Sequence, residues 1–151
     1  MLNIYAWSFR SVGFVVLTAS AIWLAAKSLT GRKLWRVLNA AFALAALVMI
    51  ARYTVLGRTH SEVHSFIFAA WPGPEFYREM VMNAFLYFPL GLSLTELAGG
   101  RSVLFALLLS LSVEAWQYFA GAGIAQGTDV IMNTLGCAVG AIPALLSRNK
   151  E

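Results

Sequence analysis

The chain has 151 residues, of which 60% are hydrophobic and 12% are charged, and its formal net charge is +4. Because soluble domains carry about 25% charged residues, this composition excludes a large soluble core and indicates a membrane protein. The length leaves room for one membrane domain, residues 1–151, and for no separate enzyme module. The basic residues stand at predicted helix ends, so we expect no nucleic-acid partner.

Five apolar runs follow one another, each near the ~20 residues that a transmembrane helix needs. They cover residues 11–28, 37–56, 79–97, 102–119 and 130–146. The first run could instead be a cleaved signal peptide, because Ala19-Ser20-Ala21 resembles a cleavage site, but the run continues through Trp23 and Leu24. We therefore predict an all-α, polytopic membrane bundle of about five helices.

Basic residues between the first two runs set the orientation. Residues 27–36 include four Lys or Arg side chains, which places this loop in the cytoplasm by the positive-inside rule. Alternation then puts the N-terminus and the loop 57–78 outside, and the C-terminus in the cytoplasm. The predicted inside holds Lys27, Arg32, Lys33, Arg36, Arg101, Arg148 and Lys150, and the predicted outside holds Arg10, Arg52, Arg58 and Arg78.

The outside loop carries aromatic side chains that suit a membrane interface. Pro72-Gly73-Pro74 stops any helix there, and we expect residues 65–71 to lie on the membrane surface or dip into it. The segment 120–128, between the last two runs, is predicted to be a second outside loop. His60 and His64 flank Glu62, but two histidines are an incomplete ligand set, so no metal is predicted.

Arg58 and Arg78 lie at the two ends of the long outside loop. Their guanidinium groups could bind lipid phosphates, or the pyrophosphate of a glycolipid. The alternative, which stays open, is ordinary interfacial anchoring or pairing with Glu75 and Glu79.

The third, fourth and fifth runs each carry polar side chains near their predicted outer ends. These residues are Asn83, Glu114, Gln117, Asp129 and Asn133, and Ser110 stands four residues before Glu114. Spacings of three and four residues put Ser110, Glu114 and Gln117 on one face of the fourth helix. Asp129 and Asn133, four residues apart, share one face of the fifth. A charged side chain inside a membrane costs roughly 2.5 kcal/mol or more. We therefore predict that these groups form one polar site between helices.

Glu114 and Asp129 are the candidate catalytic or ligand-binding groups. For Glu114 the structural alternative is a protonated acid, or one hydrogen-bonded to Ser110, Gln117 or Asn133. For Asp129 it is an N-cap on the fifth helix, where a carboxylate accepts backbone N–H bonds. The amide side chains could simply bond one helix to another.

Small residues and one proline indicate how the helices pack. Gly136 and Gly140 form a G-x-x-x-G pair that brings helices close, either within the chain or in a homo-oligomer. Pro89 should kink the third helix, and Gly91 lets a neighbour approach. Cys137 is the single cysteine, so we predict no intrachain disulfide and no cysteine metal site.

Three motifs, in this order, resemble the VanZ-like family. They are Asn83-Ala-Phe-Leu-Tyr-Phe-Pro89-Leu-Gly91, Ser110-x-x-x-Glu114-x-x-Gln117 and Asp129-x-x-x-Asn133-Thr-x-Gly136-x-x-x-Gly140. The end of the second run, Leu56-Gly57-Arg58, is similar to a subset of the family, and the likeness spans about residues 53–141. The chain departs from the pattern at Ala122, Gln126 and Thr128, where relatives commonly carry charged residues.

The resemblance implies a small multi-helix protein of a bacterial plasma membrane, with a cell-envelope role such as low-level teicoplanin resistance. Three functions stay open: an outer-leaflet pocket for membrane lipids or a lipid-linked envelope precursor, an intramembrane enzyme, and a structural subunit. In the enzyme, Glu114 or Asp129 would act as acid or base on a lipid-linked substrate. We favour the first, non-enzymatic function and expect no cofactor.

Overall fold

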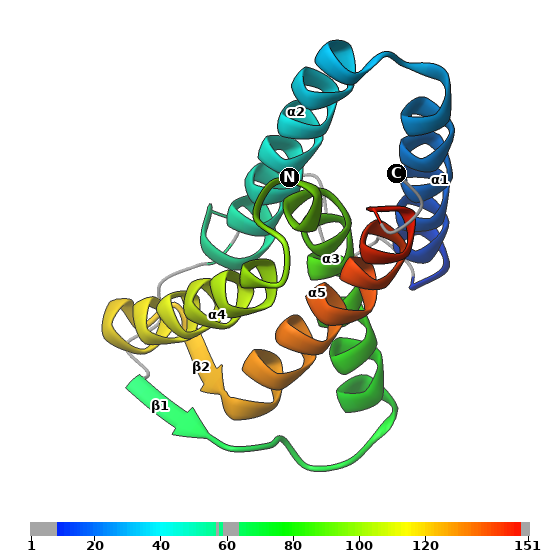
Figure 1. The fold of residues 1–151 in the computed structure, drawn as a ribbon. Coiled ribbons are helices and arrows are strands. Elements are labelled where there is room, and N and C mark those ends of the chain that lie inside the picture. Colours follow the sequence, from blue (N-terminus) through cyan, green and yellow to red (C-terminus); the bar gives the residue numbers. More distant parts are fainter. Residues whose placement is uncertain (1–8, 57, 59–63, 149–151) are drawn as a thin grey trace.

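The computed structural model describes residues 9–56, 58 and 64–148. These residues fold into five helices and two short strands (Figure 1). The helices are α1 (Phe9–Leu29), α2 (Arg32–Ala51), α3 (Pro74–Ala98), α4 (Arg101–Ala120) and α5 (Gly127–Arg148), and α2 continues as a π-helix, η2 (Arg52–Leu56). The strands are β1 (His64–Ile67) and β2 (Gly123–Gln126). The predicted all-α fold class and its five helices are confirmed.

Four of these helices are long and apolar enough to cross a membrane: α2 with η2, α3, α4 and α5. The described part of α1 adds a shorter apolar helix, Gly13–Leu29. Large apolar side chains such as Val37, Leu104 and Leu146 point outward and are exposed on these helices. A helix that is apolar on both its inward and outward faces suits a lipid surrounding. Length, composition and surface together support a multi-pass membrane bundle.

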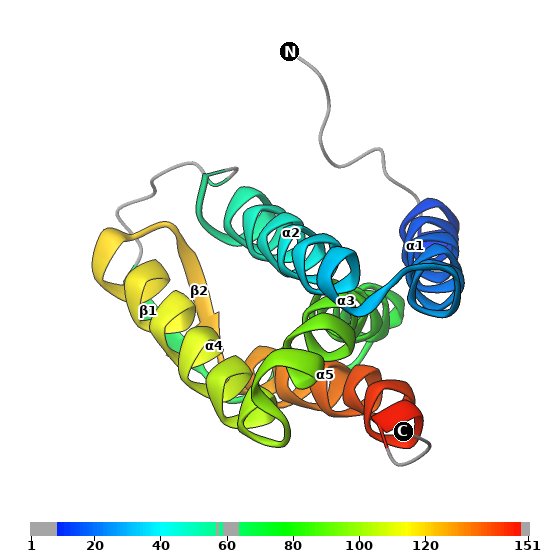
Figure 2. The same cartoon turned by 45° about the horizontal axis from the view of Figure 1, so that its top comes forward.

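α3 is the central helix of the bundle, because it contacts each of the other four (Figure 2). α5 packs very closely against it, since glycines remove side chains from the contact. A Cβ on Gly136 would lie 2.0 Å from the carbonyl oxygen of Ala84, and one on Gly140 would lie 2.1 Å from that of Phe88. Both glycines thus face α3 of the same chain. A homo-oligomer stays a prediction, and it would have to use a face of α5 other than the one that carries these glycines.

Gly91 on α3 also lets the backbones of α3 and α5 pack closely. A Cβ there would lie 2.0 Å from the carbonyl oxygen of Cys137 on α5. α3 runs through Pro89 without ending, and the Pro89 carbonyl oxygen accepts a hydrogen bond from Ser93 Oγ at 2.9 Å. The kink at Pro89 stays a prediction.

The buried apolar core surrounds α3 in two clusters. One is formed by Ala46, Ile50, Tyr87, Leu90, Ala106 and Cys137. The other is formed by Trp23, Trp35, Leu92 and Ala144. Beside the second cluster, Trp23 Nε1 donates to Asn39 Oδ1 at 2.8 Å, and Asn39 Nδ2 donates to the Ser93 carbonyl oxygen at 3.0 Å. These hydrogen bonds join α1, α2 and α3 inside the bundle.

Lys27 ties three helices together at one end of the bundle. Its Nζ lies 2.5 Å from Glu96 Oε1 on α3 and 2.7 Å from Ser147 Oγ on α5. The Lys27 and Glu96 side chains are only 13% and 11% exposed. This buried ion pair was not predicted, and it fixes α1 to the rest of the bundle.

β1 and β2 form a two-stranded parallel sheet, which corrects the prediction of plain loops at 57–78 and 120–128. His64 lies opposite Gly123 in the register, and the N–H of Thr128 donates to the carbonyl oxygen of Phe68 at 2.9 Å. The sheet and this hydrogen bond therefore hold the segment around β1 against the start of α5. Trp71, at 90% exposed, projects away from the bundle. Its contact with a membrane surface stays a prediction.

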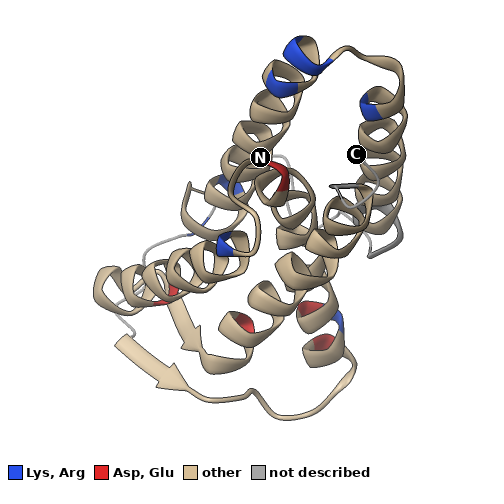
Figure 3. Cartoon of the chain, viewed as in Figure 1, with Lys and Arg blue, Asp and Glu red and all other residues tan. Residues whose placement is uncertain are grey.

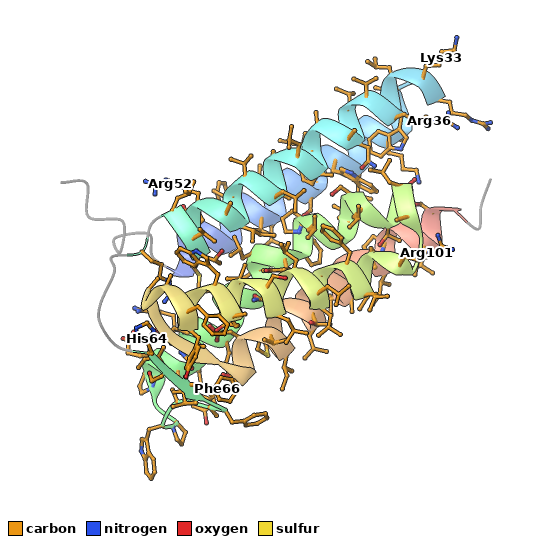
Figure 4. All side chains as sticks on the ribbon, turned by 90° about the vertical axis from the view of Figure 1, so that its left-hand side faces the viewer. Lys33, Arg36, Arg52, His64, Phe66 and Arg101 are labelled. Atoms are coloured by element: carbon orange, nitrogen blue, oxygen red, sulfur yellow. The ribbon has the colours of Figure 1, made fainter. Side chains whose placement is uncertain are left out.

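The two ends of the bundle differ in charge. Lys33, Arg36 and Arg101 lie at one end, opposite Arg52 and His64 (Figure 4). Figure 3 shows basic positions where α1 turns into α2, and acidic positions at the strand-side ends of α3, α4 and α5. This asymmetry is the basis for the predicted orientation, N-terminus outside and C-terminus in the cytoplasm, which stays a prediction.

Candidate functional site

Three polar side chains of α4 face the interior where α3, α4 and α5 meet. Ser110, Glu114 and Gln117 lie on one face of α4 because they are three or four residues apart. Their exposed fractions are 0%, 6% and 1%. On α5, Asn133 is 2% exposed, and its Nδ2 donates to Ser110 Oγ at 2.8 Å. The fold thus brings four of the predicted polar residues into one buried group.

Backbone groups of two small elements hold Glu114 and Gln117. Oε2 of Glu114 accepts a hydrogen bond from the Gln126 N–H in β2 at 2.7 Å. Side-chain partners for Glu114 were considered from the sequence, and this partner is a backbone group. Nε2 of Gln117 donates to the Thr54 carbonyl oxygen in η2 at 3.2 Å. A π-helix re-routes backbone hydrogen bonds and often marks a functional site. β2 and η2 therefore each contribute one backbone group to the site, although neither element was predicted from the sequence.

Asp129 joins the site from the first turn of α5, where the helix dipole favours a carboxylate. Because α5 begins at Gly127, Asp129 lies inside the helix instead of at its N-cap. Its carboxylate is within hydrogen-bonding reach of Asn83 and within electrostatic reach of Glu79, both on α3. The polar residues at this end therefore come from three helices.

Arg58 is the cation that faces both carboxylates. It lies within electrostatic reach of Glu114 and of Asp129. A Cβ on Gly123 would lie 2.8 Å from Arg58 Nη1, and Gly123 has a φ of 138°, which side-chain-bearing residues rarely adopt. Glycine at this position of β2 therefore leaves the space that the guanidinium occupies. The sequence carried no signal for this contact.

Two buried amide oxygens at the site have no hydrogen-bond partner within the described part of the chain. They are Gln117 Oε1 and Asn133 Oδ1. Tyr87, which packs in the apolar core, is within hydrogen-bonding reach of Ser110 and within electrostatic reach of Glu114. Leaving a buried polar group unpaired costs about 1–3 kcal/mol, so such groups are rare. Their presence together indicates a partner that the described part of the chain does not supply.

The three positions that depart from the family pattern border the site and act through their backbones. Ala122 is 1% exposed, and its N–H donates to the Gln117 carbonyl oxygen at 2.9 Å. Gln126 supplies the N–H that binds the Glu114 carboxylate. Thr128 donates its N–H to the segment after β1. Backbone groups thus make these contacts whatever the side chain.

Other predicted features lie apart from the site. Arg78 pairs with Glu75 on the surface, where their side chains are 54% and 72% exposed, so Arg58 alone of the two arginines reaches the site. His64 contacts a backbone carbonyl of α4. Within the described ranges, no group of three His, Cys, Asp or Glu side chains could hold a metal ion. Outside the residues whose side chains the structure describes lie Arg10, Gly57, His60, Glu62, Arg148 and Lys150.

A helical bundle with four potential membrane spans and a polar group buried among three of them defines a multi-pass membrane protein. The chain matches the VanZ/LLP1 family over residues 12–148, nearly its whole length, and it belongs to that family. The match confirms the resemblance and extends beyond the stretch that carries the motifs. Comparison with curated proteins and with solved structures gives no match.

Proposed function

We propose that this protein acts at the cell envelope by binding the polar headgroup of a membrane lipid, or of a lipid-linked envelope precursor, in the site between α3, α4 and α5. The site would face the outer leaflet of a bacterial plasma membrane. By holding or masking such headgroups, the protein would reduce access of a lipoglycopeptide and confer low-level tolerance to teicoplanin.

The observation that carries the proposal is the set of unpaired buried oxygens beside two carboxylates. Polar residues that serve only to join helices satisfy one another, as Trp23 and Asn39 do near the other end. At the site, Gln117 and Asn133 each use the amide nitrogen within the chain and keep the carbonyl oxygen unpaired. A hydrocarbon tail cannot satisfy these oxygens, but a lipid headgroup can.

Glu114→Gln tests the proposal with little change of shape, because the amide oxygen can still accept the Gln126 N–H. The matched control is Glu75→Gln, which removes an exposed carboxylate on α3 outside the site. A Gram-positive host would carry the wild-type chain, either variant or an empty vector, with membrane protein levels checked by blot. We expect teicoplanin tolerance from the wild type and from Glu75→Gln, and its loss in Glu114→Gln.

Two results would contradict this function. If the wild type gives the same susceptibility as the empty vector, this chain does not confer tolerance. If Glu114→Gln protects as well as the wild type at equal protein level, the carboxylate is structural and the site is not where the protein acts.

Catalysis is the second candidate, because Glu114 and Asp129 interact electrostatically and share one cation. Paired acids in different surroundings can divide the roles of acid and base. A reconstituted protein that converts a labelled lipid-linked substrate, and loses this turnover in Glu114→Gln, would favour the enzyme. An unchanged lipid after prolonged incubation would favour binding.

A further inference from the structure

The site offers more hydrogen-bond acceptors than donors. Glu114 and Asp129 contribute carboxylates, and Gln117 contributes a carbonyl oxygen whose orientation is fixed. Nε2 of Gln117 donates to the Thr54 carbonyl oxygen at 3.2 Å, so Oε1 must point elsewhere, and at 1% exposure it finds no donor among the described residues. A ligand that fits this group must bring N–H or O–H donors of its own.

The charge of the site points the same way. Glu114 and the exposed Glu79 each lie within electrostatic reach of Asp129. The cation that faces Glu114 and Asp129 is Arg58, which is exposed and rests against Gly123 at the edge of the sheet. Glu114 and Asp129 together outnumber the single guanidinium, so the charge of the site favours a positively charged ligand over an anion.

We propose that the headgroup bound here carries a primary ammonium group, an inference that rests on the headgroup-binding function proposed above. An –NH₃⁺ group supplies three N–H donors and a positive charge in one small volume. A quaternary ammonium has the charge but no donors, and a neutral sugar has donors but no charge. Arg58, at the exposed edge, would then pair with a phosphate that links the amine to its lipid.

A primary amine has two sources at an envelope. It can belong to an aminoalcohol phospholipid, or the amine can sit on the peptide of a lipid-linked precursor. Both present the same chemistry to Glu114 and Asp129, so a displacement experiment must distinguish them.

The full chain would be purified into lipid nanodiscs of phosphatidylglycerol containing equal amounts of phosphatidylethanolamine and phosphatidylcholine. After mild extraction, native mass spectrometry would count the lipids that stay bound. We expect phosphatidylethanolamine to be retained over phosphatidylcholine by about tenfold, the discrimination typical of one charge-assisted hydrogen bond. Glu114→Gln and Asp129→Asn should each lose this preference, while Glu75→Gln should keep it.

Displacement then identifies the source of the amine. Release by phosphoethanolamine and not by a lysine-containing peptide assigns the site to the phospholipid, and the opposite result assigns it to the precursor. Because Asp129 is only partly buried, Asp129→Asn provides a folded variant even where Glu114→Gln is unstable.

Two outcomes would overturn the inference, and they differ in what they leave standing. If both phospholipids bind equally and both are lost in Glu114→Gln, the proposed headgroup site stands, but the inference that it selects a primary ammonium is refuted. If no lipid binds in a way that depends on Glu114 or Asp129, the proposed function falls as well.

Discussion

Gln117 shows how a single side chain serves both the fold and the site. Its amide nitrogen satisfies a carbonyl of η2, and its amide oxygen stays unpaired in the interior. Helical spacing was enough to predict that Gln117 and Ser110 share a face with Glu114. The partners were not predictable, because Thr54 and Gln126 act through backbone groups, which carry no signature of residue type.

At the residue scale, Gly136→Ala should destabilise the protein. The added Cβ would lie 2.0 Å from the Ala84 carbonyl oxygen, so α3 and α5 must separate. Overpacking of this kind typically costs about 1–3 kcal/mol. The thermal midpoint of the purified protein in detergent, followed by circular dichroism, should fall. Gly100→Ala is the matched control, since nothing lies within 4 Å of its Cβ position and its backbone is right-handed helical. Equal midpoints for both variants would refute the close packing.

At the element scale, the helices follow from the long apolar runs, whereas the strands do not. β1 is His-Ser-Phe-Ile and β2 is Gly-Ile-Ala-Gln, each only four residues long and without a clear alternation of polar and apolar residues in the sequence. β1 lies between η2 and α3, and β2 lies between α4 and α5, so their pairing is a tertiary contact that no local pattern reports. α3 begins at Pro74, earlier than the predicted start at residue 79, because proline fits the first turn of a helix even where the sequence is still polar.

The Lys27–Glu96 pair is the contact that should hold α1 to the bundle. Lys27→Met would leave Glu96 buried without its cation, and breaking a buried pair in this way costs about 3–5 kcal/mol. The double variant Lys27→Met/Glu96→Gln should recover most of this loss, because no uncompensated charge remains. Thermal unfolding in detergent would measure both, with Arg36→Met as an exposed cation control. Loss of stability in Arg36→Met equal to that in Lys27→Met would contradict the assignment.

At the scale of the whole molecule, the polar site and the basic end lie at opposite ends of one bundle. Composition alone was enough to predict a membrane protein. The order of the three motifs was enough to predict the family. The site was predictable as a set of residues at one depth, yet its closure by Arg58, Gly123 and Tyr87 depends on tertiary contacts. Charge asymmetry remains the argument for orientation, and the proposed function requires that the site face outward.

The most direct test of that requirement is the labelling of single cysteines in intact cells. Ile124→Cys, in a Cys137→Ala background, places a thiol on β2 at a position that is 44% exposed beside the site. Gly31→Cys places one between α1 and α2 at the basic end. With a membrane-impermeant maleimide, we expect labelling at position 124 in intact cells, and at position 31 only after permeabilisation. The reverse pattern would put the site in the cytoplasm and contradict a role at the outer face of the envelope.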